Sequence, residues 1–262
     1  MLRALYTAAT GMEAQQLNID NIAHNLANIN TSGYKIRRTQ FQDLMYQNIR
    51  QAGASNTAST EIPVGLQVGL GTRPGATGII FTQGDFSPTN NPLDVVIQGK
   101  GFFQIRQVNG QIAYTRNGSF HLNRDGNIVT SEGDLLEPQI TIPQEQVAIT
   151  IGSDGTVTVQ LADQTEPQNV GRIELASFQN PAGLESIGKS LLLPTNASGD
   201  AITGTAGEDG LGTLLNGYIE QSNVSVVEEM VNMIVSQRAY EANSKVIRTA
   251  DEMFTSANNV VR

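Results

Sequence analysis

The chain has no cysteine and no tryptophan, and aromatic residues make up only 5% of its 262 positions. Without a thiol it can form no disulfide, supply no thiolate ligand to a metal and use no cysteine nucleophile. The redox compartment in which the protein works is therefore left open by its composition. The few aromatics and the 26 glycines indicate a folded protein with a thin core and many turns.

Long apolar runs are also missing. No segment approaches the roughly 20 continuous apolar residues of a membrane-spanning helix, so we expect no insertion into a membrane. Thr7, Thr10 and Glu13 interrupt the first apolar run, which argues against a cleavable secretory signal. Composition alone would place the protein in the cytoplasm, whereas the Thr-, Asn- and Gly-rich middle is more typical of an extracellular protein.

Positive charge is scarce, and its distribution is uneven. The net charge is −9, and residues 51–212 carry seven basic and sixteen acidic side chains, whereas residues 1–50 have a net charge of +2. Nucleic acids bind through basic patches that neutralise phosphates. We therefore expect no nucleic-acid partner, and an acidic middle that keeps molecules apart in solution.

Large apolar side chains recur at both ends of the chain, three or four residues apart. This spacing is typical of helices that bury one face against another helix. We call these residues the terminal stripes: Leu2, Leu5, Met12, Ile19, Ile22 and Leu26 at the first end, and Val226, Met230, Met233, Ile234, Tyr240, Ile247 and Phe254 at the second.

Two interpretations of the terminal stripes have to be weighed. The simpler one is that the two helices pack on each other inside one subunit. Both stripes are broader than one partner helix would cover, however, and each large apolar side chain left in water forgoes roughly 1.5–3 kcal/mol of burial. The stripes therefore favour assembly with further copies of the chain, and helical ends that become ordered when neighbouring copies bury them.

Between the two ends the sequence reads as β structure. A helix is expected over residues 2–29 and another from near residue 224, with a helical or extended piece at 34–50 and a linker or exposed loop at 51–61. Asp125-Gly126 and Asp154-Gly155 each separate two short β-type runs, which predicts hairpins with positive-φ turns; further strands are expected at 173–178 and 191–193.

The predicted fold class is therefore α+β. Long N- and C-terminal helices would pair as a coiled-coil layer and bracket a central, mainly antiparallel β domain. We expect three parts, namely a helical assembly domain from residues 1–45 and 213–262, an extended linker at 46–80 and a β-rich outer domain at 81–212.

Candidates for chemistry are few. His24 and His121 lack suitably spaced partners for a metal or a catalytic triad, and Gln98-Gly99-Lys100-Gly101 lacks the glycine and Ser/Thr that complete a phosphate loop. These glycines are better explained by close approach of a strand to its neighbours. Asn123, Asp125 and Asn127 resemble a calcium loop, but no glutamate closes it. We therefore predict no catalytic residue, no cofactor and no metal.

Several blocks of sequence, in the right order, resemble the axial proteins of the bacterial flagellum. Residues 27–35 (ANINTSGYK) are similar to the N-terminal signature ANxNTxGYK, and residues 91–103 are similar to a block shared by rod and hook proteins. Residues 114–120 (YTRNGSF) and 228–241 resemble two further family blocks. The signature residues that we single out are Asn28, Asn30, Thr31, Gly33, Tyr34, Gly99, Gly101, Phe102 and Phe103.

Within this family, the chain is most similar to the subunits of the distal rod. Hook proteins are usually longer because of an extra outer domain, and proximal rod proteins generally lack so large a β domain. The segment 46–63 resembles an extension that is thought to stiffen the straight rod, and its residues of interest are Tyr46, Gln47, Ile49, Arg50 and Gln51.

The resemblance implies a structural, non-enzymatic protein that polymerises into a hollow helical shaft and transmits torque from motor to hook. Its terminal helices would form an inner layer around a channel. Implied partners are further copies, other rod proteins, hook protein, the P- and L-ring proteins where there is an outer membrane, and the flagellar type III export apparatus. The implied location is the basal body in the periplasmic space, reached without cleavage of a signal.

Three alternatives stay open at this point. The chain could be another axial protein, from the hook or the proximal rod. It could be a secreted β-domain binding module with helical dimerisation ends. An enzyme is the weakest alternative, since nothing in the sequence sets Asp94, Asp125 and Asp154 at the separation that a glycoside hydrolase needs.

Overall fold

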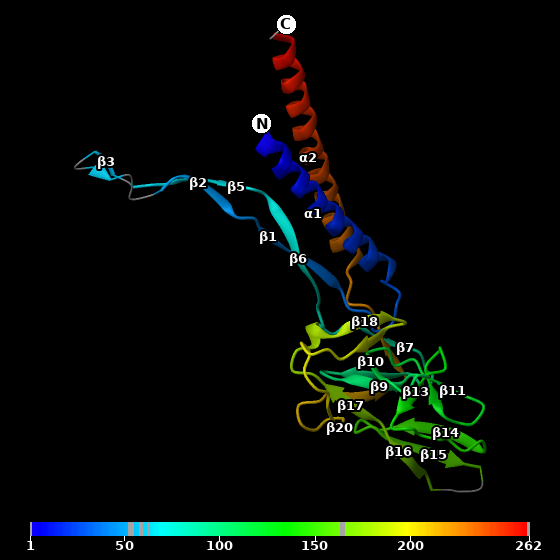
Figure 1. Cartoon of the computed structure of the whole chain (residues 1–262). Coiled ribbons are helices and arrows are strands. Elements are labelled where there is room, and N and C mark those ends of the chain that lie inside the picture. Colours follow the sequence, from blue (N-terminus) through cyan, green and yellow to red (C-terminus); the bar gives the residue numbers. More distant parts are fainter. Residues whose placement is uncertain (1, 52–54, 58–59, 62, 163–165, 261–262) are drawn as a thin grey trace. The chain divides into compact units, whose positions relative to one another are not determined.

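The computed structural model describes residues 2–51, 55–57, 60–61, 63–162 and 166–260. The chain divides into two compact units: a first unit from Met1–Leu26, Arg37–Gly78 and Ser225–Arg262, and a second unit from Ala27–Ile36 and Ile79–Val224. Figure 1 shows their elements. The predicted α+β class is confirmed, because two terminal helices pack together and bracket antiparallel β structure in the sequence.

Two long helices dominate the first unit. Helix α1 (Leu2–Ala27) and helix α2 (Val226–Val260) run side by side in opposite directions (Figure 1). Helix α1 ends two residues earlier than predicted, because Thr31 N–H bonds the carbonyl of Asn28 and opens a turn. At the start of α2, Glu228 and Glu229 occupy the first turn, where acidic side chains favour the helix dipole.

The rest of the first unit is a long two-stranded ribbon. Strand β1 (Arg37–Asp43) pairs with β6 (Thr72–Ile79), and the pairing continues outward through two further pairs. These are β2 (Tyr46–Arg50) with β5 (Leu66–Gly69), and β3 (Ser55–Thr57) with β4 (Thr60–Glu61).

The expectation of a loop at 51–61 is thus wrong where these residues are described. A ladder needs only paired backbone groups, and small polar side chains do not prevent it. The piece at 34–50, which the sequence left between helix and strand, is extended over most of its length.

The second unit consists of short antiparallel strands. One sheet has the order β11-β12-β13-β9-β10-β19-β18, with β17 also paired to β9 and to β20. Strands β14, β15 and β16 form another sheet, and β8 pairs with β21 and β7 with β22. A single turn of 3-10 helix spans Pro181–Gly183. The strands are β7 (Phe86–Pro88), β8 (Val95–Gln98), β9 (Phe102–Arg106), β10 (Ile112–Thr115), β11 (His121–Leu122), β12 (Ile128–Val129), β13 (Leu135–Glu137), β14 (Gln146–Ile151), β15 (Thr156–Leu161), β16 (Gln168–Arg172), β17 (Glu174–Ser177), β18 (Glu185–Gly188), β19 (Leu191–Leu193), β20 (Ile202–Thr205), β21 (Thr213–Asn216) and β22 (Tyr218–Glu220).

Strand β9 carries the core of this unit on both of its faces. Successive side chains of a strand point to opposite faces, so Phe102 and Phe103 enter different apolar clusters. The Phe103 ring meets Phe120 edge to face at a centroid distance of 5.1 Å, and Phe102 meets Phe81 in the same way at 5.3 Å. Two clusters that contain Phe81, Phe102, Phe103, Tyr114, Phe120 and Phe178 are thus built around one strand.

Both predicted hairpins are present, as β11–β12 and β14–β15. In each turn the glycine has positive φ (80° at Gly126 and 85° at Gly155), whereas the aspartate before it does not. The Asn123 side chain accepts hydrogen bonds from the backbone N–H of Asp125 and Asn127. These side-chain bonds hold the turn, so one left-handed residue is enough.

Candidate assembly surfaces and the signature residues

The two helices of the first unit contact each other through polar and small residues. The Asn18 side chain donates from Nδ2 to Ser236 Oγ at 2.8 Å, and Asn25 Nδ2 donates to Glu229 Oε2 at 2.9 Å. At Gly11, a Cβ atom would lie 2.9 Å from Nδ2 of Asn243. We call the contacts Gly11–Asn243, Asn18–Ser236 and Asn25–Glu229 the polar seam.

The terminal stripes flank the polar seam rather than forming its centre. On α1, Ile22 is buried, and Leu5, Met12, Ile19 and Leu26 are half-buried; the side chain of Leu2 lies outside the described residues. On α2, Met233 and Ile247 are half-buried. The remaining stripe residues of α2 are exposed in the single subunit: Val226, Met230, Ile234, Tyr240 and Phe254.

Several large apolar side chains are exposed along the first part of α2. Val227, Ile234 and Val235 are 72%, 56% and 61% exposed. Val227 lies two residues before Glu229 in the polar seam, and a rotation of about 100° per residue places it on the opposite side of the helix. We define the outer face of α2 as the exposed residues Val226, Val227, Met230, Val231, Ile234 and Val235.

In the second unit, the signature blocks meet at a buried carboxylate, Glu220. Its side chain accepts from Lys35 Nζ at 2.6 Å and from Arg116 Nε at 3.2 Å. It also accepts from the backbone N–H of Gly84 at 3.0 Å, and its own carbonyl accepts from Gly33 N–H at 2.8 Å. We call Glu220, Lys35 and Arg116 the buried ionic cluster.

The glycines of two signature blocks make room for Arg116. Its Nη1 donates to the carbonyls of Gly99 at 2.9 Å and Gly101 at 2.7 Å, and both glycines have positive φ. Gly33 also has positive φ, and a Cβ there would lie 2.7 Å from the carbonyl carbon of Arg116. The predicted close approach at Gly99 is confirmed, because a Cβ would lie 3.1 Å from the Cα of Gly212.

Lys35 and Arg116 share the carboxylate of Glu220. This arrangement, together with burial, shifts the pKa of Lys35. Burial lowers the pKa of Lys35 below its ordinary value, Glu220 opposes this effect, and the neighbouring Arg116 lowers the pKa further. Lys35 Nζ also donates to the carbonyl of Thr82 at 2.6 Å. The excess positive charge is thus held by a carbonyl dipole as well as by the acid.

Asn223 makes further hydrogen bonds close to the buried ionic cluster. Asn223 Oδ1 accepts from the N–H of Ile36 at 2.7 Å, and its Nδ2 donates to the carbonyls of Ile80 and Thr82 at 3.0 and 3.1 Å. Sequence reasoning did not single out Glu220 or Asn223. The signal available for Glu220 was the presence of Lys35 and Arg116 inside signature blocks that carry no acid of their own, since buried cations require an acid.

The other signature residues shape the turn after α1. Thr31 Oγ1 donates to Asn28 Oδ1 at 3.2 Å, Asn30 is exposed and Tyr34 is half-buried. Phe102 and Phe103 belong to the two apolar clusters described above. These residues therefore support the fold of the second unit.

The segment that resembles the rod extension lies on the ribbon. Tyr46, Gln47, Ile49, Arg50 and Gln51 are all exposed, and the ring of Tyr46 lies over Gly69 of the paired strand. A hydrogen bond to the Asp43 carboxylate raises the pKa of the Tyr46 hydroxyl.

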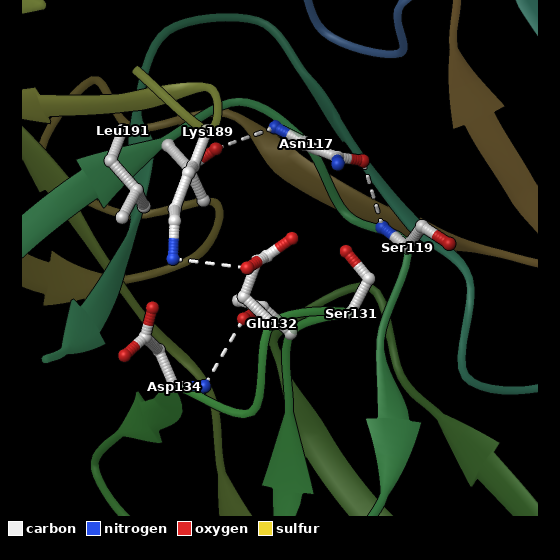
Figure 2. Close-up of a pocket in the computed structure, with 9 residues that line it drawn as sticks. Asn117, Ser119, Ser131, Glu132, Asp134, Lys189 and Leu191 are labelled. Atoms are coloured by element: carbon white, nitrogen blue, oxygen red, sulfur yellow. Dashed lines mark hydrogen bonds and ion pairs between the residues drawn. The ribbon is translucent and has the colours of Figure 1, made fainter. Parts of the chain in front are cut away.

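One surface pocket of the second unit is too small for a ligand. Figure 2 shows a surface pocket in which Lys189 Nζ lies 2.9 Å from Glu132 Oε2, with Asn117, Ser119 and Asp134 around it. Its volume of 20 Å³ suits about one water molecule. Among the residues that the structure describes, no group of three acids or histidines could hold a metal, and no helix is long and apolar enough to cross a membrane.

Two of the three acids considered for catalysis, Asp94 and Asp154, accept hydrogen bonds within their own turns. Asp94 is buried and accepts from Asn91 Nδ2 at 3.1 Å. Asp154 accepts from the hydroxyl of Thr156 in its own hairpin, and this bond lowers the pKa of its carboxyl. Asp125 is exposed in the other hairpin turn.

Comparison with protein families shows the class of protein to which this chain belongs. Residues 5–35 match the family described as flagella basal body rod protein, residues 96–159 the D1 domain of the flagellar hook proteins FlgE/F/G, and residues 215–260 the C-terminal region of the basal body rod FlgEFG proteins. The matched regions include both helices and the strands around Arg116. The class is that of the rod and hook proteins of the flagellum.

Individual relatives narrow the class. The chain is 49% identical to the flagellar basal-body rod protein FlgG of Borreliella burgdorferi over 100% of both chains, and 49% identical to that of Caulobacter vibrioides over 99% of both. It is 48% identical to FlgG of Buchnera aphidicola subsp. Schizaphis graminum over 97% of both chains. The chain belongs to the family of the flagellar basal-body rod protein FlgG. It is a structural subunit of the flagellar rod and not an enzyme.

Proposed function

We propose that this subunit polymerises through its helical unit into the distal rod, a hollow helical drive shaft between motor and hook. The observation that carries the proposal is the outer face of α2. Its large side chains stay exposed in the single subunit, with Val227 at 72% and Val235 at 61%. A surface of this kind on a rod protein is best explained by contact with neighbouring subunits.

The energetics favour the same conclusion. Burying an exposed valine, methionine or isoleucine gains about 1.5–3 kcal/mol per side chain, and the six residues of the outer face lie along less than three turns of α2. Long helices are stabilised chiefly by packing of an apolar face rather than by intrinsic propensity. Association of several copies would supply that packing, because it would bury the apolar residues of the terminal stripes.

The ribbon offers a second contact surface. Met45, Tyr46, Ile49 and Leu66 are exposed on its outer part, and Met45 is 83% exposed. We propose that the ribbon, including the segment from Tyr46 to Gln51, reaches a neighbouring subunit and stiffens the rod. The signature residues would act indirectly, by holding the chain segments 27–36 and 220–224 together in the second unit.

We propose the following surroundings for the subunit. It would contact other rod proteins and hook protein at the ends of the polymer, and ring proteins that surround the rod where there is an outer membrane. It would work in the periplasmic space, after passage through the flagellar type III export apparatus. Assembly with other rod components follows from the names of its relatives, whereas these particular neighbours come from the resemblance described at the outset.

Electron microscopy of the concentrated, purified chain tests the proposal, with circular dichroism recorded before and after assembly. Straight tubular polymers, together with a gain in helical signal, are expected. Curved polymers would instead place the chain with hook-like proteins. A discrete dimer with unchanged helical signal would contradict the proposal and favour a binding module with helical dimerisation ends.

A further inference from the structure

A larger pocket of the second unit lies on the apolar cluster around Phe102. Its volume is about 210 Å³, against 20 Å³ for the pocket at Lys189. The rings of Phe81, Phe102 and Phe178 line it, and they meet edge to face at centroid distances of 5.3 and 5.8 Å. We call it the aromatic pocket. It is smaller than the roughly 300–1,000 Å³ of sites for small molecules, and it suits a single large side chain.

The aromatic pocket is positively charged, although it belongs to an acidic unit. Among the described residues, its lining contains two cations, Lys100 and Arg116, and no acid. Lys100 is exposed, and Arg116 belongs to the buried ionic cluster, in which two cations face one carboxylate. The second unit (residues 27–36 and 79–224) carries sixteen acidic and only seven basic side chains. The complementary occupant is therefore a large apolar side chain with an acid beside it.

The ribbon of the first unit carries this combination. Met45, between the ends of β1 and β2, is 83% exposed, and a flexible thioether packs well against aromatic rings. Asp43 is also exposed, and its carboxylate accepts a hydrogen bond from the hydroxyl of Tyr46. The Tyr46 ring is held against the paired strand, since a Cβ at Gly69 would lie 3.4 Å from it. The acid is thus fixed close to a methionine that is left uncovered.

Backbone pairing holds Met45 away from the pocket of its own chain. The pairing begins at Ile36 and Ile80, the residue before Phe81, and continues outward to Leu44. The nine residues from Ile36 to Met45, at about 3.3 Å each, span roughly 30 Å of ribbon. A ribbon that stays paired does not fold this length back onto its own start, so the occupant of the pocket has to come from another copy.

We propose that the aromatic pocket of one copy binds Met45 of a second copy, with Asp43 of that second copy facing Lys100. A side chain buried in a pocket supplies most of the affinity, whereas an ion pair at the rim sets the orientation. The pocket and Met45 are different surfaces, so each copy can receive one neighbour and bind another, as a polymer requires. The inference rests on the proposed contact between the ribbon and a neighbouring subunit, and it names the site that receives the ribbon.

Crosslinking of full-length chains tests the inference, because the chain has no cysteine of its own. One chain carries Gln47→Cys, two residues after Met45. A second chain, with a different tag, carries Gln179→Cys at an exposed residue of the pocket lining. The two chains are mixed at high concentration and treated with a short bis-maleimide, so that a product with both tags reports contact between copies.

The positional control replaces Gln179→Cys by Val108→Cys, at a turn residue that is 98% exposed. Random encounters would favour this more accessible position. We expect the crosslink at position 179 to exceed that at position 108 by about fivefold or more, because docking raises the effective concentration of the two thiols.

Substitutions in the two chains separate docking from mere encounter. Met45→Asp should reduce the crosslink to the control level, whereas Val64→Asp, at another exposed apolar residue of the first unit, should not. Lys100→Glu in the pocket chain should lower it by about threefold or more, because two acids would face each other. Arg124→Glu makes the same change of charge at an exposed turn and should have no effect. Asp43→Lys in the ribbon chain should restore the crosslink with the Lys100→Glu pocket.

Three outcomes would overturn the inference. The first is a crosslink at position 179 no stronger than at position 108, and the second is an unchanged crosslink with Met45→Asp or Lys100→Glu. The third is a crosslink only inside a chain that carries both cysteines, which would show that the pocket receives the ribbon of its own chain.

The crosslink needs only two copies and is read whether or not tubes form. Straight tubes without the crosslink would overturn the inference and leave the proposed function standing. A crosslink without tubes would support the pocket and contradict the proposed polymer.

Discussion

The two units of this chain place their apolar and charged residues in opposite ways. In the second unit the aromatic rings of Phe103 and Phe120 are inside, most acids are outside, and the buried charges of the ionic cluster are paired. In the first unit, polar residues form hydrogen bonds between the helices, and the large apolar residues of the outer face of α2 are exposed. The second unit has a buried core of its own, whereas we propose that the first is completed by other copies.

The largest effect is expected when a charge is placed on the outer face of α2. Ile234→Asp should abolish polymerisation, because an acid would have to be buried among apolar side chains of neighbouring copies. Leu26→Asp on α1 should do the same. Sedimentation and electron microscopy at concentrations that yield tubes from the unchanged chain measure this, while circular dichroism should show that the β unit stays folded.

The comparison variant is Ile202→Asp, at an isoleucine of the second unit that is 58% exposed, close to the 56% of Ile234. It should polymerise. Tubes from the Ile234 or Leu26 variants, or loss of tubes from the Ile202 variant alone, would contradict the assignment of assembly to the helical unit.

The next effect concerns the ionic cluster. Glu220→Gln should destabilise the second unit by about 3–5 kcal/mol, because it leaves two buried cations without their acid. Urea unfolding followed by near-ultraviolet circular dichroism measures the change. Glu137→Gln is the control, since Glu137 pairs with Arg106 at the surface and should contribute less than about 1 kcal/mol. Equal effects would mean that the cluster has no special role.

A smaller effect, with a distinctive pH dependence, is expected at Lys35. Burial lowers the pKa of Lys35 in the folded chain from the ordinary value of 10.5. Between the lowered pKa and 10.5 the unfolded chain binds more protons than the folded one, so stability contributed by this group rises with pH in that window. Lys35→Met should cost about 1–2 kcal/mol at neutral pH and remove the rise.

Urea unfolding midpoints of the two chains from pH 7 to 10.5 provide the measurement. Other titrating groups cancel in the difference between the chains. Parallel profiles would show that burial of Lys35 is not felt as a pKa shift.

The smallest effect is expected from Val235→Thr, which keeps the shape of the side chain but adds a hydroxyl to the outer face. The stability of the single subunit should not change, because the residue is 61% exposed. The critical concentration for assembly should rise about five- to tenfold, which corresponds to about 1–1.4 kcal/mol. Val147→Thr, at an exposed valine of β14, should leave the critical concentration unchanged.

Much of the fold could be predicted, because local signals were strong. The helices were predicted to within about two residues, and the Asp-Gly turns identified two hairpins. The ribbon was harder to predict from the sequence. The pairing of β1 with β6 and of β2 with β5 depends on long-range backbone hydrogen bonds, and the small polar side chains of the ribbon give no strong strand pattern.

The sequence indicated the proposed assembly surface only in part. The spacing of Val226, Met230 and Ile234 was recognised, but which side of α2 faces α1 could not be, because both sides carry apolar residues. The deciding residues are Ser236 and Glu229, whose burial depends on Asn18 and Asn25 in the other helix. The division into a helical assembly domain, an extended linker and a β-rich outer domain, with boundaries at residues 45, 80 and 212, stays a prediction.

The ionic cluster also affects the order in which parts of the chain can fold. Lys35 and Glu220 are 185 residues apart in the chain, so their contact closes a very long loop and forms only after most of the sequence is available. A chain that emerges gradually from one end can fold individual hairpins at once, but it cannot fasten residues 33–36 to residues 220–223 until its last fifth has appeared. A chain that ends before Glu220 therefore lacks the contact that joins residues 33–36 to residues 220–223, and only a chain that includes Glu220 can form it.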